Sequence, residues 1–425
     1  MKQNNKMKYV IIGNSTAATA AVEGIRKIDK QGEITVISGE AHHTYSRPLI
    51  SYLLAGKVTQ EGMKYRDNDF YVKNGVRLLY ATAKSIDAKG KQVILTDGNS
   101  VPYTKLLAAT GSAPFVPPFE GLDTVNNKVT FMSLDDARKL EEMLDENKRV
   151  LIVGGGLIGL KCAEGILERA ARAKAASGKA ARVTVVDMAP RILSSILDEG
   201  GAAMVQKHLE SRGVEFRLST QIKKFNSGTA VLENGETLSF DILVLAVGVR
   251  PNTALLNGVA DIDRGVNVNE KSQTSAPDIY AAGDCTQTLD VSSGQRKIMA
   301  LLPNAYIQGE CAGINMAGGE KIFDRAIPMN AIRFFGLNII TAGNYSGETY
   351  LKNENGNYKR LFYSGNKLNG FIMTGNVEKA GIYTSLIRER TPLDTIDFAL
   401  VCEKPGLMAF TKEDRMAKLG MGELS

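Results

Sequence analysis

The stretch RVLIVGGGLIGLKCAE, residues 149–164, places three glycines directly after an apolar run. Gly154, Gly156 and Gly159 have the spacing G-x-G-x-x-G, and a pattern typical of a helix follows them. The next apolar run, VTVVD, ends in the acid Asp187. A strand, a glycine turn, a helix and a second strand with a terminal acid form the fingerprint of a dinucleotide-binding unit. The stretch therefore predicts a parallel sheet with a dinucleotide at this turn.

A second, incomplete copy of this turn opens the chain. Residues 9–22 read YVIIGNSTAATAAV, where Gly13 is followed by Ser15 and Ala18 in the places of the other two glycines. The three glycines serve a tight turn, close approach of the backbone to the pyrophosphate, and tight helix–strand packing. Gly13 keeps the first task, Ala18 is small enough for the third, and the Ser15 hydroxyl can donate to a phosphate oxygen. We interpret this turn as a dinucleotide site, with Glu40 beyond the next strand as the candidate ribose acceptor.

Two hairpin patterns indicate that the chain contains one supersecondary unit twice. VILTDGNSVPYTKLLAATG (93–111) aligns without a gap on AVLENGETLSFDILVLAVG (230–248), 137 residues later. Gly13 and Gly154 are separated by a similar interval of 141 residues. Each segment has alternating apolar residues, an Asp-Gly or Asn-Gly hairpin turn, and then an apolar strand that ends in glycine. A chance similarity of two hairpins would not keep all these elements in register, so the repeat supports the incomplete turn.

Composition restricts the class of function. A chain of 425 residues can form two or three domains, and 44% hydrophobic and 23% charged residues are typical of soluble globular proteins. The longest apolar run, residues 242–249, is the length of a buried strand, and the polar start carries no signal-peptide core. We therefore expect a cytoplasmic protein without a membrane span. A net charge of +6 without a basic tract among aromatics argues against nucleic acid as a partner.

The cysteines and histidines predict neither a metal centre nor a disulfide framework. The four cysteines lie far apart and form no C-x-x-C pair: Cys162, Cys285, Cys311 and Cys402. The three histidines have no metal-ligand spacing: His42, His43 and His208. We expect free thiols in a reducing compartment and a buried structural thiol at Cys285. His42 and His43 are expected in a solvent-facing loop, with contact to the adenosine of a dinucleotide as the alternative, and His208 on a helix surface.

Four further stretches resemble the two-dinucleotide-domain flavoprotein reductases. They are TYSRPLIS (44–51), LLAATGSAPFVPP (106–118), VGVRPNT (247–253) and SAPDIYAAGD (275–284). This FAD and pyridine-nucleotide family contains glutathione reductase, NADH oxidases, and the rubredoxin and ferredoxin reductases. The resemblance covers nearly the whole chain and implies an α/β fold with two Rossmann-like domains, for FAD and NAD, and a C-terminal α+β interface domain. This is a glutathione-reductase-like architecture.

The resemblance also implies domain limits and cofactor-binding residues. It predicts an FAD domain from 7–117 and 251–324, an NAD(H) domain from 118–250, and an interface or dimerisation domain from 325–425. It assigns FAD to Gly13, Ser15, Thr16, Ala18, Glu40, Arg47, Pro48, Thr110, Gly111, Gly283 and Asp284. It assigns NAD(H) to Gly154, Gly156, Leu157, Ile158, Gly159, Asp187 and Gly248.

Within the FAD assignment, the resemblance gives the residues different parts of the cofactor. Glu40 would meet the adenosine ribose, whereas Arg47 and Pro48 would lie by the isoalloxazine. Thr110 and Gly111 would lie near the adenine half. Asp284 would take a ribityl hydroxyl or approach the pyrophosphate.

The chain departs from the family pattern in two places. Disulfide-reducing members keep a redox cysteine on the helix that faces the flavin, but there is no cysteine between Ser38 and Gly75. The pattern instead resembles the rubredoxin and ferredoxin reductase branch. That branch often pairs a lysine with a glutamate near flavin N5. Tyr52 and Lys161 stand at those positions here, so we expect this pair to be lost or inverted.

We interpret the chain as an FAD-dependent NAD(P)H oxidoreductase. It would pass electrons, in either direction, between NADH and an iron–sulphur acceptor: rubredoxin, ferredoxin or an iron–sulphur subunit of a larger complex. Hydride transfer between nicotinamide and flavin needs no metal and no catalytic side chain, so none is assigned. Asp187 favours NADH over NADPH. A stand-alone NADH oxidase and a flavin-holding scaffold are the alternatives, and the assembly would be a homodimer or a hetero-oligomeric complex.

A basic extension of the helix after the second turn has two interpretations. The segment ERAARAKAASGKAARV, residues 168–183, places Arg169 and Arg172 on one helix face. A solvated helix surface is the simpler interpretation, and a docking patch for an acidic partner is the alternative.

Overall fold

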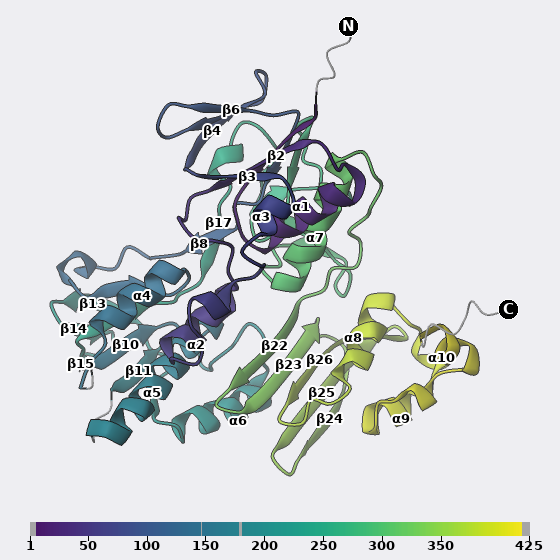
Figure 1. Ribbon diagram of the computed structural model, residues 1–425. Helices are drawn as coiled ribbons and strands as arrows, with labels where there is room; N and C mark the ends of the chain where they lie inside the picture. The colour runs from purple at the N-terminus through teal and green to yellow at the C-terminus, as the bar shows by residue number, and fades with distance from the viewer. Residues whose placement is uncertain (1–5, 146, 178–180, 419–425) are drawn as a thin grey trace, which may run out of the picture. The chain divides into compact units, whose positions relative to one another are not determined.

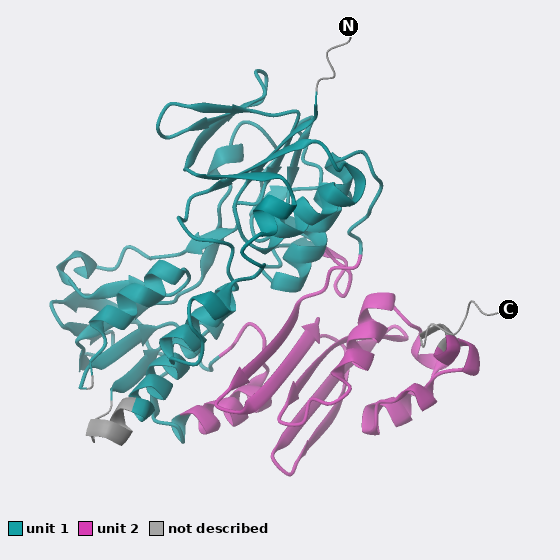
Figure 2. Cartoon of the chain, viewed as in Figure 1, with its two compact units in different colours: residues 1–192, 210–288, 296–324 teal, residues 193–209, 289–295, 325–425 magenta. Residues whose placement is uncertain are grey.

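The computed structural model describes residues 6–145, 147–177 and 181–418 (Figure 1). The chain divides into two compact units (Figure 2). The first comprises residues 1–192, 210–288 and 296–324, and the second comprises residues 193–209, 289–295 and 325–425. Both predicted dinucleotide turns fall in the first unit.

The first unit contains two parallel five-stranded sheets, in which four strands have the same order. The fifth strand, at one edge, comes last in the chain in one sheet and first in the other. One has the order β19-β7-β1-β2-β3, and the other has the order β12-β11-β10-β16-β9. The strands of the first sheet are β1 (Lys8–Ile12), β2 (Glu33–Ser38), β3 (Val76–Tyr80), β7 (Lys105–Ala108) and β19 (Ile279–Ala281). Those of the second are β9 (Lys128–Thr130), β10 (Arg149–Val153), β11 (Arg182–Val186), β12 (Val214–Arg217) and β16 (Ile242–Leu245). In each sheet the opening strand, β1 or β10, lies in the centre, and its near-continuous apolar sequence is buried, as expected for parallel strands.

The predicted repeat extends to the hairpins. Each copy has a three-stranded antiparallel sheet, and their strands are β4 (Ala83–Asp87), β5 (Gln92–Leu95), β6 (Ser100–Pro102), β13 (Ile222–Asn226), β14 (Thr229–Leu232) and β15 (Thr237–Ser239). The turns contain Gly98 at φ +88° and Gly235 at φ +86°. After each copy one further strand follows, and these two strands, β8 (Ser112–Pro114) and β17 (Val249–Pro251), pair with each other. The internal repeat is confirmed from its first strand to this pair.

Helices α1 (Thr16–Ile28) and α7 (Leu302–Met316) lie side by side over the first sheet (Figure 1). Their contact is made by small residues. A Cβ added at Gly309 would lie 2.1 Å from the carbonyl oxygen of Ala17, and one at Gly313 would lie 2.2 Å from that of Ala21. The alanine-rich sequence after the first turn therefore allows two helix backbones to approach closely.

Four other helices of the first unit are α2 (Ile50–Leu54), α3 (Phe70–Lys73), α4 (Leu134–Met143) and α5 (Leu157–Ser177). Helix α4 begins with a capping box, in which the Ser133 side chain accepts from the Asp136 N–H and the Asp136 side chain accepts from the Ser133 N–H. Helix α2 packs on α5 at Gly165, where a Cβ would lie 2.9 Å from the Ser51 carbonyl oxygen.

Strands β18 (Val266–Asn267) and β20 (Thr286–Asp290) form a short parallel pair, and β21 (Gln295–Lys297) follows them in the chain.

The second unit is built on an antiparallel sheet of order β22-β23-β26-β25-β24. Its strands are β22 (Met329–Phe334), β23 (Leu337–Gly343), β24 (Glu348–Glu354), β25 (Asn357–Ser364) and β26 (Lys367–Thr374). Helices α8 (Ala380–Glu389), α9 (Phe398–Glu403) and α10 (Lys412–Lys418) follow, and α6 is Glu199–Glu210. Asp198, directly before α6, accepts hydrogen bonds from the side chains of Tyr358 and Arg360. No helix in the described residues is both long enough and apolar enough to cross a membrane.

The contact between α1 and α7 can be tested with a single methyl group. We expect Gly309→Ala to lower the free energy of unfolding by about 1–3 kcal/mol, because the new Cβ meets a backbone oxygen that cannot move aside. Ile307→Ala, on the exposed side of α7, is the control and should change it by about 0.5 kcal/mol or less. Chemical denaturation of both variants makes the comparison, and equal stability would contradict the close packing.

Candidate functional site

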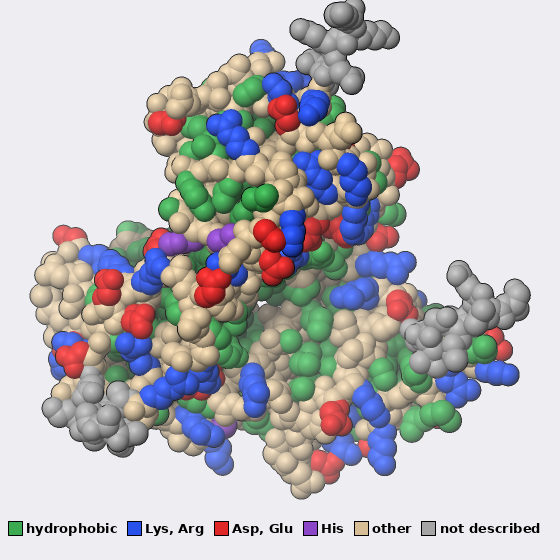
Figure 3. All heavy atoms as spheres, in the orientation of Figure 1, with side chains coloured by type: hydrophobic (Ala, Val, Ile, Leu, Met, Phe, Trp, Pro, Cys, Tyr) green, Lys and Arg blue, Asp and Glu red, His purple; other side chains and the backbone are tan. Residues whose placement is uncertain are grey.

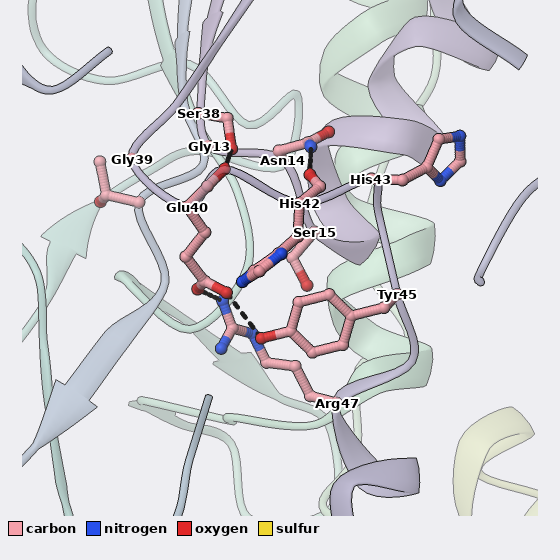
Figure 4. Close-up of a pocket in the computed structure, with 11 residues that line it drawn as sticks. Gly13, Asn14, Ser15, Ser38, Gly39, Glu40, His42, His43, Tyr45 and Arg47 are labelled. Carbon is pink, nitrogen blue, oxygen red and sulfur yellow. Dashed lines mark hydrogen bonds and ion pairs between the residues drawn. The ribbon is translucent and has the colours of Figure 1, made fainter. Parts of the chain in front are cut away.

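A cleft opens at the carboxyl ends of the neighbouring strands β7, β1 and β2. This is the edge of a parallel sheet at which ligands bind. Its lining residues, drawn in Figure 4, are Gly13, Asn14, Ser15, Ser38, Gly39, Glu40, His42, His43, Tyr45, Arg47 and Thr110. Five of the residues predicted to bind FAD are thus brought together here: Gly13, Ser15, Glu40, Arg47 and Thr110.

The turn after β1 has the geometry of the complete turn after β10. Gly13 has φ +119° and Gly154 has φ +116°. A Cβ at Gly13 would lie 2.1 Å from the Ala109 carbonyl oxygen, and one at Gly154 would lie 2.2 Å from that of Ala246. Both positions therefore require glycine for the same reason, namely close contact with the strand that follows the hairpin.

The structure also explains why Ser15 can replace the second glycine. At Gly156, the matching position of the complete motif, an added Cβ would meet no atom within 4 Å. A small side chain is therefore sterically allowed at this position. Ser15 is the N-cap residue of α1, and its side chain makes no capping hydrogen bond. Its hydroxyl therefore remains available for an anion at the helix N-terminus.

Glu40, Tyr45 and Arg47 form one hydrogen-bonded group in the cleft (Figure 4). The Tyr45 hydroxyl donates to Glu40 Oε2 at 2.6 Å, and the Arg47 guanidinium is ion-paired with Glu40 Oε1. Burial raises the pKa of Tyr45, which stays a neutral phenol. Burial lowers the pKa of Arg47, but the interactions with Tyr45, Glu40 and Asp284 raise this pKa by more, so the net shift is upward. The group thus presents a fixed cation and a carboxylate acceptor side by side.

This ion pair bears on two expectations from the sequence. Glu40 was assigned to the adenosine ribose and Arg47 to the isoalloxazine, at opposite ends of FAD. A direct ion pair places the two side chains at one end of the cleft. A guanidinium paired in this way matches a phosphate better than an uncharged ring.

The expectation of solvent-facing positions is met only in part, because His42, His43 and His208 are all half-buried. The His42 side chain is 13% exposed, and its Nε2 lies 2.8 Å from Asp135 Oδ1. The ring of His43 points away from the group around Glu40 (Figure 4) and packs edge-on against Tyr71 at a centroid distance of 5.0 Å. His208 is partly buried and lies 3.1 Å from the Phe334 carbonyl oxygen through Nε2. For His42 and His43 the loop position suggests exposure, because no sequence signal reports packing against a distant aromatic or acid.

Asp284 follows β19 and lies on the same side of the sheet as Arg47. Burial raises the pKa of Asp284, while a hydrogen bond from Ser112 and the charge of Arg47 oppose this shift. Gly283, with φ +83°, donates its N–H to Gln308 Oε1 at 2.8 Å. The Gly-Asp turn is thus held by α7, and its carboxyl group is electrostatically linked to the cleft.

At the glycine turn after β10, Asp187 makes structural hydrogen bonds in addition to its predicted role in binding NAD(H). Its Oδ2 accepts from the Gly155 N–H at 2.6 Å, and its Oδ1 accepts from the Ala189 N–H at 2.7 Å. A Cβ at Gly159 would lie 2.1 Å from the Gly154 carbonyl oxygen, which explains the third glycine. The acid at the end of β11 therefore fixes the glycine turn and stays half-exposed beside it.

Tyr52 and Lys161 meet between α2 and α5. The Lys161 ammonium lies 4.9 Å from the centre of the Tyr52 ring, a cation–π contact. The carboxylate partner of Lys161 is Glu164, one turn along α5, whose side chain is 8% exposed. A tyrosine–lysine contact therefore stands where the reductase branch often has its lysine–glutamate pair. The acid that pairs with Lys161 lies on the same helix as the lysine.

The two arginines of the basic extension have internal partners. Arg169 is ion-paired with Glu141 of α4 at 2.7 Å, and Arg172 donates to the Gly56 carbonyl oxygen at 2.6 Å. These contacts favour a structural helix surface over a docking patch. Residues 178–180 of the extension lie outside the described residues.

Residues 7–309 match the family model described as pyridine nucleotide-disulphide oxidoreductase. The chain belongs to this family. Residues 328–391 match a second model, the rubredoxin NAD+ reductase C-terminal domain. The expected family and the two-dinucleotide-domain fold are confirmed. As a member the protein is an oxidoreductase, and FAD and a pyridine nucleotide are the cofactors of this family.

Individual relatives agree with this family. The epsilon subunit of NADH-dependent phenylglyoxylate dehydrogenase from Aromatoleum evansii is 34% identical over 401 residues, which is 91% of this chain and 92% of that protein. Rubredoxin-NAD(+) reductase from Pseudomonas putida is 31% identical over 320 residues, which is 73% of this chain and 80% of that protein. The fold is also that of a putidaredoxin reductase in covalent complex with putidaredoxin, with a TM-score of 0.84, 23% identity, and coverage of 99% of this chain and 100% of that one.

The residues of the cleft fit FAD. A helix N-terminus without a capping side chain, a guanidinium and a carboxylate acceptor together match a pyrophosphate and a ribose. Gly13 brings the backbone close enough for this contact. In the described part of the chain, no group of three or more His, Cys, Asp or Glu side chains is arranged to hold a metal ion.

The burial of the four cysteine thiols indicates how reactive they are. All four cysteines are free and buried: Cys162, Cys285, Cys311 and Cys402. Burial raises the pKa of each thiol, that of Cys402 to about 11. A protonated, inaccessible thiol is a poor nucleophile. The expectation of free thiols and of a buried thiol at Cys285 agrees with the structure.

The first turn can be tested through flavin content. We expect Gly13→Val to yield protein without bound flavin, because the side chain would overlap the Ala109 carbonyl oxygen and the residue has a positive φ. Ser15→Gly restores the ordinary motif and should keep full flavin content. The measurement is the ratio of flavin to protein absorbance, with circular dichroism to check the fold. Full flavin occupancy in Gly13→Val would contradict the assignment of this turn.

Proposed function

We propose that this protein transfers electrons between NADH and a one-electron iron–sulphur acceptor through bound FAD. The observation that carries the proposal is the combination of a C-terminal segment matching the rubredoxin NAD+ reductase domain with four buried, protonated thiols. Without a reactive thiol, electrons have no route to a disulfide through this chain's cysteines. The Pseudomonas putida relative is named for rubredoxin, which supports a small iron–sulphur carrier as the acceptor.

Bound FAD would supply hydride chemistry, since a flavin accepts two electrons and can release them singly. The residues of this chain would bind and orient it. Arg47 and the N-terminus of α1 would hold the pyrophosphate, with the Ser15 hydroxyl donating to it. Glu40 would accept from the adenosine ribose. This proposal moves Arg47 from the isoalloxazine to the phosphates, in agreement with its ion pair to Glu40.

NAD(H) would bind at the turn of Gly154, Gly156 and Gly159, next to Asp187. We propose the domain limits 7–117 with 251–324 for FAD and 118–250 for NAD(H), with 325–425 as an interface domain. The partner of that interface would be a second copy of the chain or a subunit of a larger complex, as the Aromatoleum evansii relative is a subunit.

Asp187 should give a preference for NADH. Its carboxylate lies at the end of β11, where it would accept from a ribose 2′-hydroxyl and repel a 2′-phosphate. We expect kcat/KM to be about 10–100-fold higher for NADH than for NADPH, because like charges in contact are strongly unfavourable. Asp187→Asn keeps one acceptor oxygen for the turn and should reduce this ratio. Equal use of both cofactors by the unmutated protein would refute this role.

Acceptor choice tests the proposed function. We expect negligible reduction of glutathione disulfide, coenzyme A disulfide or lipoamide, and rapid reduction of ferricyanide, viologen or an acidic iron–sulphur protein. Lys and Arg side chains are interspersed with acids on the face in Figure 3, so attraction would come from the net charge of +6. The rate with the acidic carrier should therefore fall as salt shortens the Debye length to about 8–10 Å. Efficient disulfide reduction would overturn the proposal.

A further inference from the structure

Three side chains of the FAD cleft are anchored by one short segment that lies between the two copies in the chain. The Tyr45 hydroxyl accepts from the Leu134 N–H at 3.0 Å, and Arg47 donates to the Met132 carbonyl oxygen at 3.2 Å. His42 Nε2 lies 2.8 Å from Asp135 Oδ1. Residues 132–135 thus contact the cleft-lining side chains from behind, although none of the four lines the cleft itself.

This segment is itself rigidly held. It forms the start of α4, where Asp136 Oδ2 accepts from the N–H groups of Met132 and Ser133 and from the Thr130 hydroxyl. Thr130 ends β9, which pairs with β16 in the second sheet. The support behind the first dinucleotide cleft therefore belongs to the sheet that carries the second glycine turn.

We propose that residues 132–135 are a positioning element for FAD. They hold His42 at the cleft, and they hold Tyr45 and Arg47 in the orientation in which both meet Glu40, so that these side chains are in place before the cofactor arrives. Arg and Glu are long side chains with many rotamers, and fixing them in advance removes that ordering cost from binding. The inference rests on FAD binding in this cleft and is independent of which protein accepts the electrons.

The geometry assigns the most informative variant to Asp135. Its side chain is 63% exposed and touches the cleft through His42, so Asp135→Ala removes one of the three anchors without removing a cleft residue. Glu142→Ala removes the same charge from the exposed side of the same helix and is the matched control. Asp135→Asn keeps an oxygen acceptor and serves as the conservative variant. Tyr45→Phe removes both the bond to Leu134 and the bond to Glu40.

The first measurement is the FAD dissociation constant of flavin-free protein, from the quenching of flavin fluorescence on binding. Losing one hydrogen bond of this kind should weaken binding about three- to tenfold in Asp135→Ala, and more in Tyr45→Phe, which loses two. Glu142→Ala and Asp135→Asn should stay within about twofold of the unmutated protein. The thermal midpoints of flavin-free Asp135→Ala and Asp135→Asn should be alike, because both variants lose the negative charge in the first turn of α4, and this comparison separates positioning from general stability.

The second measurement is hydrogen exchange in the segment 131–140 with and without FAD. In the unmutated protein FAD should slow exchange there, because a filled cleft fixes the acceptor of the Leu134 N–H. In Tyr45→Phe this effect of FAD should be lost. Unchanged affinity in both Asp135→Ala and Tyr45→Phe, with no effect of FAD on exchange, would overturn the inference. Failure of the unmutated protein to bind FAD would instead refute the cleft assignment on which it rests.

Discussion

The structure depends on a close backbone contact that occurs twice. After each opening strand, a glycine with φ near +118° passes a carbonyl oxygen of the strand that follows the hairpin, so closely that a Cβ would lie 2.1–2.2 Å from it. This contact brings a helix N-terminus to the edge of the sheet, where unpaired N–H groups can face an anion. The same steric constraint shapes both glycine turns. Its recurrence is visible in the sequence as the 141-residue interval between the turns and the 137-residue interval between the hairpins.

Much of the fold could be predicted because its signals are local. Apolar strands, glycine turns and Asp-Gly or Asn-Gly hairpins each report the backbone within a few residues, and their repetition confirmed the less complete copy. Ser15 was the weakest point of that prediction. The open space at Gly156 shows why it is tolerated, since the second glycine of the motif is needed for the approach of a ligand and not for packing within the protein.

The site was predicted less fully, because its contacts join segments far apart in the chain. The place of Glu40 after a strand predicts a role at the ribose, but nothing local indicates that Tyr45 and Arg47 converge on it. His42 was expected to face solvent because its acid partner, Asp135, lies 93 residues away. Arg169 and Arg172 share a helix face as expected, yet their partners on α4 and at Gly56 give them structural contacts that composition could not show.

The proposed chemistry follows from the residues that line the cleft and from the burial of the thiols. Its cleft provides charge and hydrogen bonds for a dinucleotide, while its thiols are buried and protonated, so the cofactors must carry the electrons. The most direct test is anaerobic rapid mixing of the flavin-loaded protein with NADH, followed by an iron–sulphur carrier. The account predicts that NADH bleaches the flavin absorbance and that the carrier restores it in one-electron steps without added disulfide or oxygen. Absence of bleaching by NADH, or recovery only with oxygen, would contradict it.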